Sequence, residues 1–422
     1  MKALLINPWI ADFAAYNFWI RPLGLYSLAS WLDSLGVTVS IIDCLSPFKA
    51  PGKFNREVIK KTPFKLPILI DRSFARYGIS KEEFRKRLEI IRGFDVVFIT
   101  SVMSYWYLGI KWVLDELNRL AVSVPIILGG VYATLWPEHA QKELDVDFIC
   151  KGPLELNKDK LISFLGLEKR IRYERPWYEI LEWDFVNYGA VRTAIGCPFS
   201  CTYCASRILT GGFKPITLKA VIDEILFYYS KGVKQIAFYD DALLVDFEQR
   251  LLPILEFLQK KHISFEFHTP NGLHARLITE KVAKWLVKSN FKTIRLSLET
   301  INRDRQKITG NKVSNEELEA AVKALINAGM EPENIGVYLL IGLPGQDLDE
   351  VEEGIKFVKK LGVRPYLAEF SPIPGTLEWT RLEKDQIVSK DMDPILTNNT
   401  IFFRIYSNYD IKKFNKLKKL AR

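Results

Sequence analysis

The chain has 422 residues, of which 48% are hydrophobic and 26% are charged, and its formal net charge is +9. This length exceeds what one hydrophobic core usually supports, so we expect two globular domains. The composition argues against a disordered or fibrous protein, and no apolar run approaches the length of a membrane span. Residues 1–8 do not resemble a signal peptide, so we expect a cytoplasmic protein.

Residues 1–155 alternate short apolar runs with helical patterns. The runs K-A-L-L-I, V-T-V-S-I-I-D, F-D-V-V-F-I-T, P-I-I-L and D-F-I-C predict strands separated by helices. This alternation predicts a doubly wound α/β domain, a Rossmann-like parallel sheet covered on both faces. Ligands of such sheets bind at the carboxyl ends of the strands. Residues 44–93 interrupt the pattern, and we expect them to form an insertion near the ligand.

Three of the five cysteines, Cys197, Cys201 and Cys204, lie within eight residues, in the stretch I-G-C-P-F-S-C-T-Y-C. A structural zinc site needs four ligands, and no second Cys or His pair lies nearby. A disulfide framework would require an even number of cysteines in a secreted chain. Three thiolates fit a [4Fe–4S] cluster better, because they leave one of its four irons open to an outside molecule.

The C-x-x-x-C-x-x-C spacing, with Tyr203 before the last cysteine and the strand-like V-R-T-A-I-G in front, resembles the radical S-adenosylmethionine (SAM) superfamily. The resemblance implies that the amino and carboxylate groups of SAM chelate the open iron. It also implies that one electron cleaves SAM to a 5′-deoxyadenosyl radical. An electron donor such as flavodoxin or ferredoxin is then expected as a partner.

The second half of the chain alternates strands and helices again. Together with the run before the cysteines, five later strand-like runs predict a partial (β/α)6 TIM-like barrel, whose chemistry gathers at the carboxyl ends of its strands. We assign residues 1–155 to the Rossmann-like domain and 156–188 to a linker with a short wrapped segment. Residues 189–376 form the radical SAM core, and 377–422 form a helical extension. The basic stretch I-K-K-F-N-K-L-K-K-L within that extension predicts a solvated amphipathic helix.

Polar and turn residues follow the strands of the predicted barrel. The resemblance implies that SAM is contacted by Tyr203, Asp240, Asp241, Glu299, Gly342, Pro344 and Gly375. For Asp240 and Asp241, substrate positioning and capping of the next helix remain open. His268 and Asn271 are candidate substrate contacts, although the following turn explains part of their motif. We expect His262 and His274 in solvent or in turns.

The strand ends of the first domain resemble the cobalamin-binding domain that precedes some radical SAM domains. The similarity lies in S-V-M, in G-G and in the text L-G-G-V-Y-A-T-L-W-P-E-H-A. The implied cobalamin contacts are Asn7, Pro8, Ser101, Met103, Tyr105, Trp106, Gly129 and Gly130. Tyr105 and Trp106 either lie against the corrin or pack the next helix. The D-x-H-x-x-G motif is missing, so no lower axial histidine is expected.

The two resemblances predict a cobalamin-dependent radical SAM enzyme that methylates an unactivated carbon through methylcobalamin. Its cofactors would be a [4Fe–4S] cluster, SAM and cobalamin, and no catalytic residue is assigned. Two alternatives remain: a redox or rearrangement enzyme with the same cofactors but no methyl transfer, and a non-catalytic cobalamin or SAM sensor. The substrate would be a small molecule or a peptide, and the positive charge slightly favours an anionic one. Because this charge is spread along the chain, a nucleic-acid partner is not expected.

Overall fold

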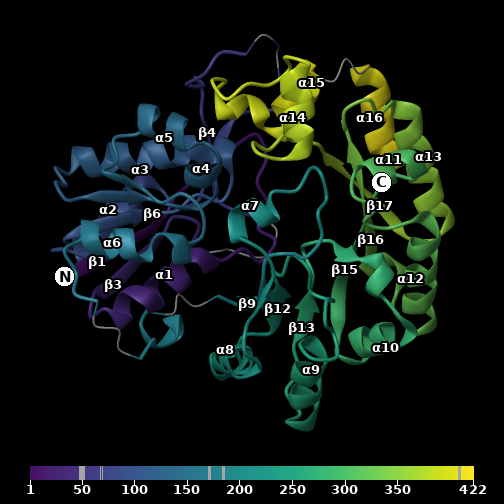
Figure 1. Cartoon of the computed structure of the whole chain (residues 1–422), viewed down its shortest axis with the longest axis horizontal. Helices are drawn as coiled ribbons and strands as arrows, with labels where there is room; N and C mark the ends of the chain where they lie inside the picture. Colours follow the sequence, from purple (N-terminus) through teal and green to yellow (C-terminus); the bar gives the residue numbers. More distant parts are fainter. Residues whose placement is uncertain (47–52, 67, 69, 170–172, 183–185, 407–409) are drawn as a thin grey trace. The chain divides into compact units, whose positions relative to one another are not determined.

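The computed structural model describes residues 1–46, 53–66, 68, 70–169, 173–182, 186–406 and 410–422. The chain divides into two compact units (Figure 1). The first comprises Met1–Val186 with Ser389–Asn398, and the second comprises Asn187–Val388 with Asn399–Arg422. Within the described ranges, every helix is too short or too polar to serve as a membrane span.

The first unit is built on a five-stranded parallel sheet. Its strands are β1 (Lys2–Asn7), β3 (Thr38–Asp43), β6 (Val96–Ile99), β7 (Ile126–Leu128) and β8 (Phe148–Ile149), in the order β3-β1-β6-β7-β8. The chain between them forms α1 (Leu23–Ser34), α3 (Tyr107–Arg119), α4 (Gly130–Leu135) and α5 (Pro137–Glu143). The predicted doubly wound fold is confirmed. Its topological switch point, where such sheets bind ligands, lies between β1 and β6.

A second, antiparallel sheet in the first unit was not predicted. It joins β2 (Ile10–Asp12), β5 (Ala75–Tyr77) and β4 (Arg56–Val58), and α2 (Lys81–Ile90) follows it. Ile10, Leu45, Ala75 and Tyr77 form its buried core. Strands of three residues leave no readable alternation, which is why the sequence did not predict them. Residues 47–52, 67 and 69 of the predicted insertion lie outside the described residues.

The predicted linker packs onto the first unit, which extends to Val186 rather than ending at residue 155. It contains η2 (Leu154–Leu156), α6 (Lys158–Phe164) and η3 (Trp177–Glu179). The Trp177 ring stacks on Tyr26 of α1, with centroids 4.1 Å apart and planes 13° from parallel. Burial of this indole explains why the segment wraps on the sheet domain. Residues 170–172 and 183–185 lie outside the description.

The second unit contains six parallel strands that neighbour one another in chain order. They are β9 (Tyr188–Val191), β12 (Gln235–Phe238), β13 (Glu266–His268), β15 (Phe291–Glu299), β16 (Ile335–Ile341) and β17 (Arg364–Glu369). The main connecting helices are α8 (Leu218–Ser230), α9 (Leu251–Lys260), α10 (Glu280–Lys288), α12 (Asn315–Asn327) and α13 (Leu348–Lys360). Figure 1 shows α10, α12 and α13 along the outer side of β15, β16 and β17. The predicted partial (β/α)6 barrel is confirmed.

The helical extension contains α14 (Leu377–Lys384), η6 (Pro394–Thr397), α15 (Asn399–Tyr406) and α16 (Ile411–Leu420). Helix α16 is amphipathic, as predicted. It buries Phe414 and Leu417, and its Lys418 ammonium donates to Glu369 of β17 over 2.5 Å. The lysines on its other side face solvent, so the basic stretch is mainly a solvated helix face.

Part of the extension returns to the first unit at the switch-point edge of its sheet. The Tyr107 hydroxyl donates to Asp393 over 3.0 Å, and the amide of Asn398 donates to the buried carboxylate of Asp12 over 3.0 Å. The same carboxylate accepts from the Trp106 indole over 2.6 Å. The buried carboxylate of Asp12 therefore binds Asn398, a residue 386 positions away in the sequence.

We predict that Asn398→Ala destabilises the first unit by about 1–3 kcal/mol, because the buried Asp12 carboxylate loses a donor that water cannot replace. Asn415→Ala, on the exposed face of α16, is the matched control and should change stability by less than about 0.5 kcal/mol. Urea unfolding followed by tryptophan fluorescence measures both variants. Equal midpoints for the two variants would contradict this role of Asn398.

Candidate active site

A buried carboxylate turns the chain out of the barrel at the end of β9. The backbone N–H groups of Thr193 and Ala194 donate to Asp240 over 2.9 and 2.8 Å, and the Thr193 hydroxyl donates over 2.6 Å. The Arg250 guanidinium completes the set over 2.7 Å. The predicted strand V-R-T-A-I is therefore split: β9 ends at Val191, and Ala194–Ile195 (β10) pairs antiparallel with Lys214–Pro215 (β11).

The two adjacent acids face different surroundings. Asp240 is 3% exposed, and its carboxylate is taken up by the turn just described. Asp241 instead lines the cavity beside the cysteines and accepts from the Ser206 hydroxyl over 2.5 Å. A SAM or substrate contact therefore remains a prediction that fits Asp241, whereas Asp240 positions the chain in front of the cysteines.

The three clustered cysteines line one cavity of about 340 Å³ at the carboxyl end of the barrel. The other lining residues are Phe199, Tyr203, Ser206, Asp241, Pro270, Asn271, Gly272, His274, Lys312 and Tyr338. They come from the loop after β9 and from the ends of later strands, which is the face where barrels of this type carry their chemistry.

Two glycines let the cysteine loop pack against its neighbours. Gly196 has φ +79°, and a Cβ there would lie 2.1 Å from the carbonyl oxygen of Gly212. Gly310 has φ +107° and lies against Ser200, where a Cβ would meet the backbone at 2.9 Å. The N–H of Thr202 donates to the Thr309 carbonyl over 3.2 Å. The loop is thus held by backbone contacts that side chains would disrupt.

The three thiols are a donor set that an iron-sulfur cluster can use. Among the residues described, no three His, Cys, Asp or Glu side chains converge as ligands of one metal ion would. A cubane does not require such convergence, because each cysteine binds a different iron. Burial raises the pKa of Cys197 to about 11 and also raises the pKa of Cys201 and Cys204. Iron is the partner that would hold them as thiolates. The N–H of Ser206 points at the Cys204 sulfur, 3.5 Å away.

Glu299 ends β15 in a strained conformation and holds a buried lysine. Its φ is +70°, in the left-handed region that non-glycine residues seldom adopt, and such outliers gather at functional sites. Its carboxylate lies 3.1 Å from the Lys312 ammonium, which lines the cavity. Burial raises the pKa of the Cys201 and Cys204 thiols, and the positive charge of Lys312 partly opposes this shift. Glu299 is therefore linked to the cavity through its ion pair with Lys312.

Two residues that line the cavity, His274 and Lys312, were not identified from the sequence as site residues. His274 is 4% exposed and lies in the short strand β14 (Leu273–His274), so the prediction of a solvent or turn position was wrong. Its ring stacks on Phe199 with centroids 4.2 Å apart. Burial lowers the pKa of His274 to about 3, and the nearby Lys312 charge adds to the shift. Lys312 carries no motif of its own, and only the packing of Gly310 on the cysteine loop brings it there.

The predicted substrate contacts are separated. Asn271 lines the cavity, and its amide donates to the Asp240 carbonyl over 3.2 Å. His268 lies deeper in the barrel, where its Nδ1 is 3.0 Å from the Thr293 hydroxyl. Burial lowers the pKa of His268 to about 4, and the charge of Arg295 adds to this effect. A substrate role thus stays a prediction for both residues, and only Asn271 borders the cysteine cavity.

Comparison with known proteins identifies the barrel. Residues 191–358 match the family model described as the radical SAM superfamily, and this range contains the cysteine loop and most of the strand ends above. Residues 191–358 therefore form a radical SAM domain. Its superfamily uses a [4Fe–4S] cluster and SAM, and the three thiols around one cavity suit both.

The similarity to known proteins extends beyond the barrel. It is 26% identical over 331 residues to an uncharacterized methyltransferase of Pyrococcus horikoshii, covering 69% of this chain and 70% of that protein. The structure of TsrM from Kitasatospora setae with cobalamin and a [4Fe–4S] cluster matches with a TM-score of 0.67 at 14% identity, over 91% of this chain and 75% of TsrM. OxsB with aqua-cobalamin and SAM matches with a TM-score of 0.59 at 16% identity, over 91% of this chain and 55% of OxsB. These two structures share the fold.

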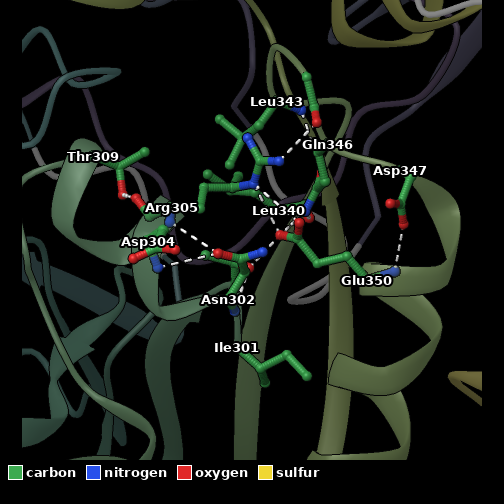
Figure 2. Close-up of polar contacts among 12 residues, drawn as sticks. Ile301, Asn302, Asp304, Arg305, Thr309, Leu340, Leu343, Gln346, Asp347 and Glu350 are labelled. Atoms are coloured by element: carbon green, nitrogen blue, oxygen red, sulfur yellow. Dashed lines mark hydrogen bonds and ion pairs between the residues drawn. The ribbon is translucent and has the colours of Figure 1, made fainter.

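The loop after β16, which contains the predicted SAM contacts Gly342 and Pro344, is held in place by neighbouring side chains. Figure 2 shows Arg305 reaching the loop after β16, where its guanidinium donates to the carbonyls of Pro344 and Gly345, each over 2.8 Å. The Gln346 side chain accepts from the Gly342 N–H over 3.0 Å, and Glu350 pairs with Arg305 over 2.9 Å. None of the three predicted glycine and proline contacts lines the cysteine cavity. Gly375, with φ +82°, packs against Ile208 instead.

In the first unit the predicted cobalamin contacts gather at the switch point. Asn7, Pro8, Ser101 and Trp106 line one cavity there, but its volume is only about 10 Å³, enough for about one water. Gly130, with φ +89°, packs on Ser101, whose carbonyl a Cβ would meet at 2.4 Å. This cavity is therefore narrow, and contact with cobalamin stays a prediction for the residues that line it.

The predicted cobalamin contacts also interact with other residues of the first unit. The Asn7 amide donates to Asp43 over 2.7 Å, and the Ser101 hydroxyl donates to the Gly129 carbonyl over 3.1 Å. Tyr105 is 6% exposed and meets the Trp106 ring edge to face, while Met103 precedes this turn and is half-buried. Packing of the helix is thus one role of these aromatics, and contact with a corrin stays a prediction.

We predict that Gly196→Ala lowers the stability of the second unit and its iron content after anaerobic reconstitution, because the added Cβ clashes with the Gly212 carbonyl in a left-handed conformation. Gly24→Ala, in an open position of α1, is the control and should bind iron like the wild type. Iron content equal to that of the wild type in Gly196→Ala would contradict this account of the loop.

Lys312→Met should destabilise the second unit by about 3 kcal/mol, because it leaves the Glu299 carboxylate buried without its cation. Adding Glu299→Gln to it should recover most of this loss. The exposed pair Lys281–Glu248 supplies the control, since Lys281→Met should cost less than about 1 kcal/mol. Chemical denaturation of the wild type, Lys281→Met, both single variants of the pair and the double variant tests the prediction, and additive losses in the double variant would refute the pairing.

Proposed function

We propose that this protein is a cobalamin-dependent radical SAM methyltransferase that methylates an unactivated carbon. The observation that carries the proposal is the gathering of Cys197, Cys201 and Cys204 around one cavity at the carboxyl end of a partial barrel. When bound there, the cluster and SAM would supply a 5′-deoxyadenosyl radical, and methylcobalamin would supply the methyl group.

The described residues would divide the work of holding these groups. The three cysteines would bind three irons and leave the fourth open. Asp241 and the Lys312–Glu299 pair present both charge signs to the cavity, which suits the ammonium and carboxylate of a methionyl group. Phe199, His274 and Tyr338 supply apolar walls that keep water from a reactive intermediate.

The cobalamin part of the proposal has separate support. TsrM and OxsB, which share the fold, have been solved with cobalamin, and four of the eight predicted contacts line one cavity of the first unit. We propose that these residues hold the cobalamin at the strand ends of the first unit. Electrons would come from a donor such as flavodoxin or ferredoxin. We propose a soluble cytoplasmic enzyme with a small-molecule or peptide substrate.

Cysteine replacement after anaerobic reconstitution tests the cluster. The wild type should show the absorption and electron paramagnetic resonance (EPR) signals of a [4Fe–4S] cluster and should release 5′-deoxyadenosine from SAM when reduced. Cys201→Ala should lose both. Cys150→Ala, a half-buried thiol in the first unit, should keep both. A wild type that binds zinc, or a Cys201→Ala variant that still cleaves SAM, would refute the proposal and favour a sensor.

Labelled SAM tests the methyl transfer. With cobalamin and a reductant present, the label of methyl-¹⁴C SAM should pass to cobalamin and then to an added substrate pool from the source cells. Substrate consumption without transfer of the label would instead favour the redox or rearrangement alternative.

A further inference from the structure

A second cavity adjoins the cysteine cavity on the other side of Cys204. It also has a volume of about 340 Å³, and it shares Cys204, Ser206 and Asp241 with the first. Its other walls include Arg192 and Tyr239 from strand ends and Ile373 from the loop after β17. Because only one of the three cysteines borders it, the cluster belongs to the first cavity. The second is open to another molecule.

The wall of this second cavity contains a cation without a bonded partner. Arg192 is half-buried, and the residues that the structure describes offer it no hydrogen bond and no ion pair. Burial lowers the pKa of Arg192, although the charges of Asp240, Asp241 and Glu224 oppose the shift. A partly desolvated guanidinium that makes no hydrogen bond to the protein is unfavourable, so proteins often provide acceptors for it.

The nearby carboxylates are occupied elsewhere. Asp240 is neutralised by Arg250 and by the turn at Thr193. Asp241 accepts from the Ser206 hydroxyl. Lys312, by contrast, already has Glu299 as its partner in the first cavity. Arg192 is therefore the cavity cation whose planar set of N–H donors remains available to an outside oxyanion.

We propose that Arg192 binds a carboxylate or phosphate group of the substrate in this second cavity. The inference rests on the proposed function, which places the cluster and SAM in the first cavity and leaves the second for the molecule that reacts. A guanidinium binds such groups through two parallel hydrogen bonds, so it fixes the orientation of a ligand as well as its charge. The substrate class is then an anion small enough for a cavity of this size.

The test uses the full chain, anaerobically reconstituted and saturated with SAM, with sodium acetate and inorganic phosphate as probes. Melting temperatures are measured against sodium chloride at equal ionic strength. At least one probe should stabilise the wild type saturably, and Arg192→Gln should bind it at least tenfold more weakly. Arg207→Gln, an exposed arginine in the helix after the cysteine loop, should match the wild type. Equal affinity in Arg192→Gln, or no saturable effect in the wild type, overturns the proposal.

Two further measurements separate this inference from other outcomes. SAM affinity in Arg192→Gln should change less than threefold, and a loss matching that of the probe would assign Arg192 to SAM and overturn the inference. Without ligand, Arg192→Met should be at least as stable as the wild type, because it removes a partly desolvated charge that has no bonded partner. Clear destabilisation would reveal a protein partner and also overturn it. Absence of a [4Fe–4S] signal in the wild type would instead count against the proposed function.

Discussion

The buried carboxylate of Asp240 is the interaction on which the site depends. It gathers the N–H groups of Thr193 and Ala194 and the guanidinium of Arg250 at the point where the first barrel strand ends. This arrangement directs the chain away from the barrel wall and into the cysteine loop. The same turn places Arg192 and Asp241 on the wall of a cavity. The buried ion pair of Asp240 with Arg250 therefore positions these residues, although neither member of the pair lines that cavity.

The cysteine cavity combines rigidity with strain. Gly196 and Gly310 allow backbone segments to approach more closely than side chains would permit, and Glu299 holds a left-handed conformation at the end of β15. Such features lower stability and are retained where a site must be formed before its ligand arrives. The loop after β16 is also fixed in advance, by hydrogen bonds and an ion pair among Arg305, Gln346 and Glu350. None of these three side chains lines the cysteine cavity.

Much of the fold could be predicted because the strands are apolar runs separated by helical patterns. The cysteine spacing likewise indicated the cluster site directly. The sequence could not reveal contacts formed by distant segments, such as Asn398 on Asp12 or Lys312 on Glu299, because nothing local marks them. The sequence also could not assign different roles to Asp240 and Asp241, because the two residues are identical in type and only the structure shows which way each side chain points. His274 was misjudged because a histidine beside a turn is usually solvated.

The central claim is that three cysteine thiolates hold a cubane whose fourth iron is open to SAM. Electron-nuclear double resonance on the reduced protein, with SAM carrying ¹⁵N in its methionyl amino group, tests this most directly. The account predicts a hyperfine coupling between that nitrogen and the cluster. A well-formed cluster with no such coupling, although SAM is bound, would contradict it.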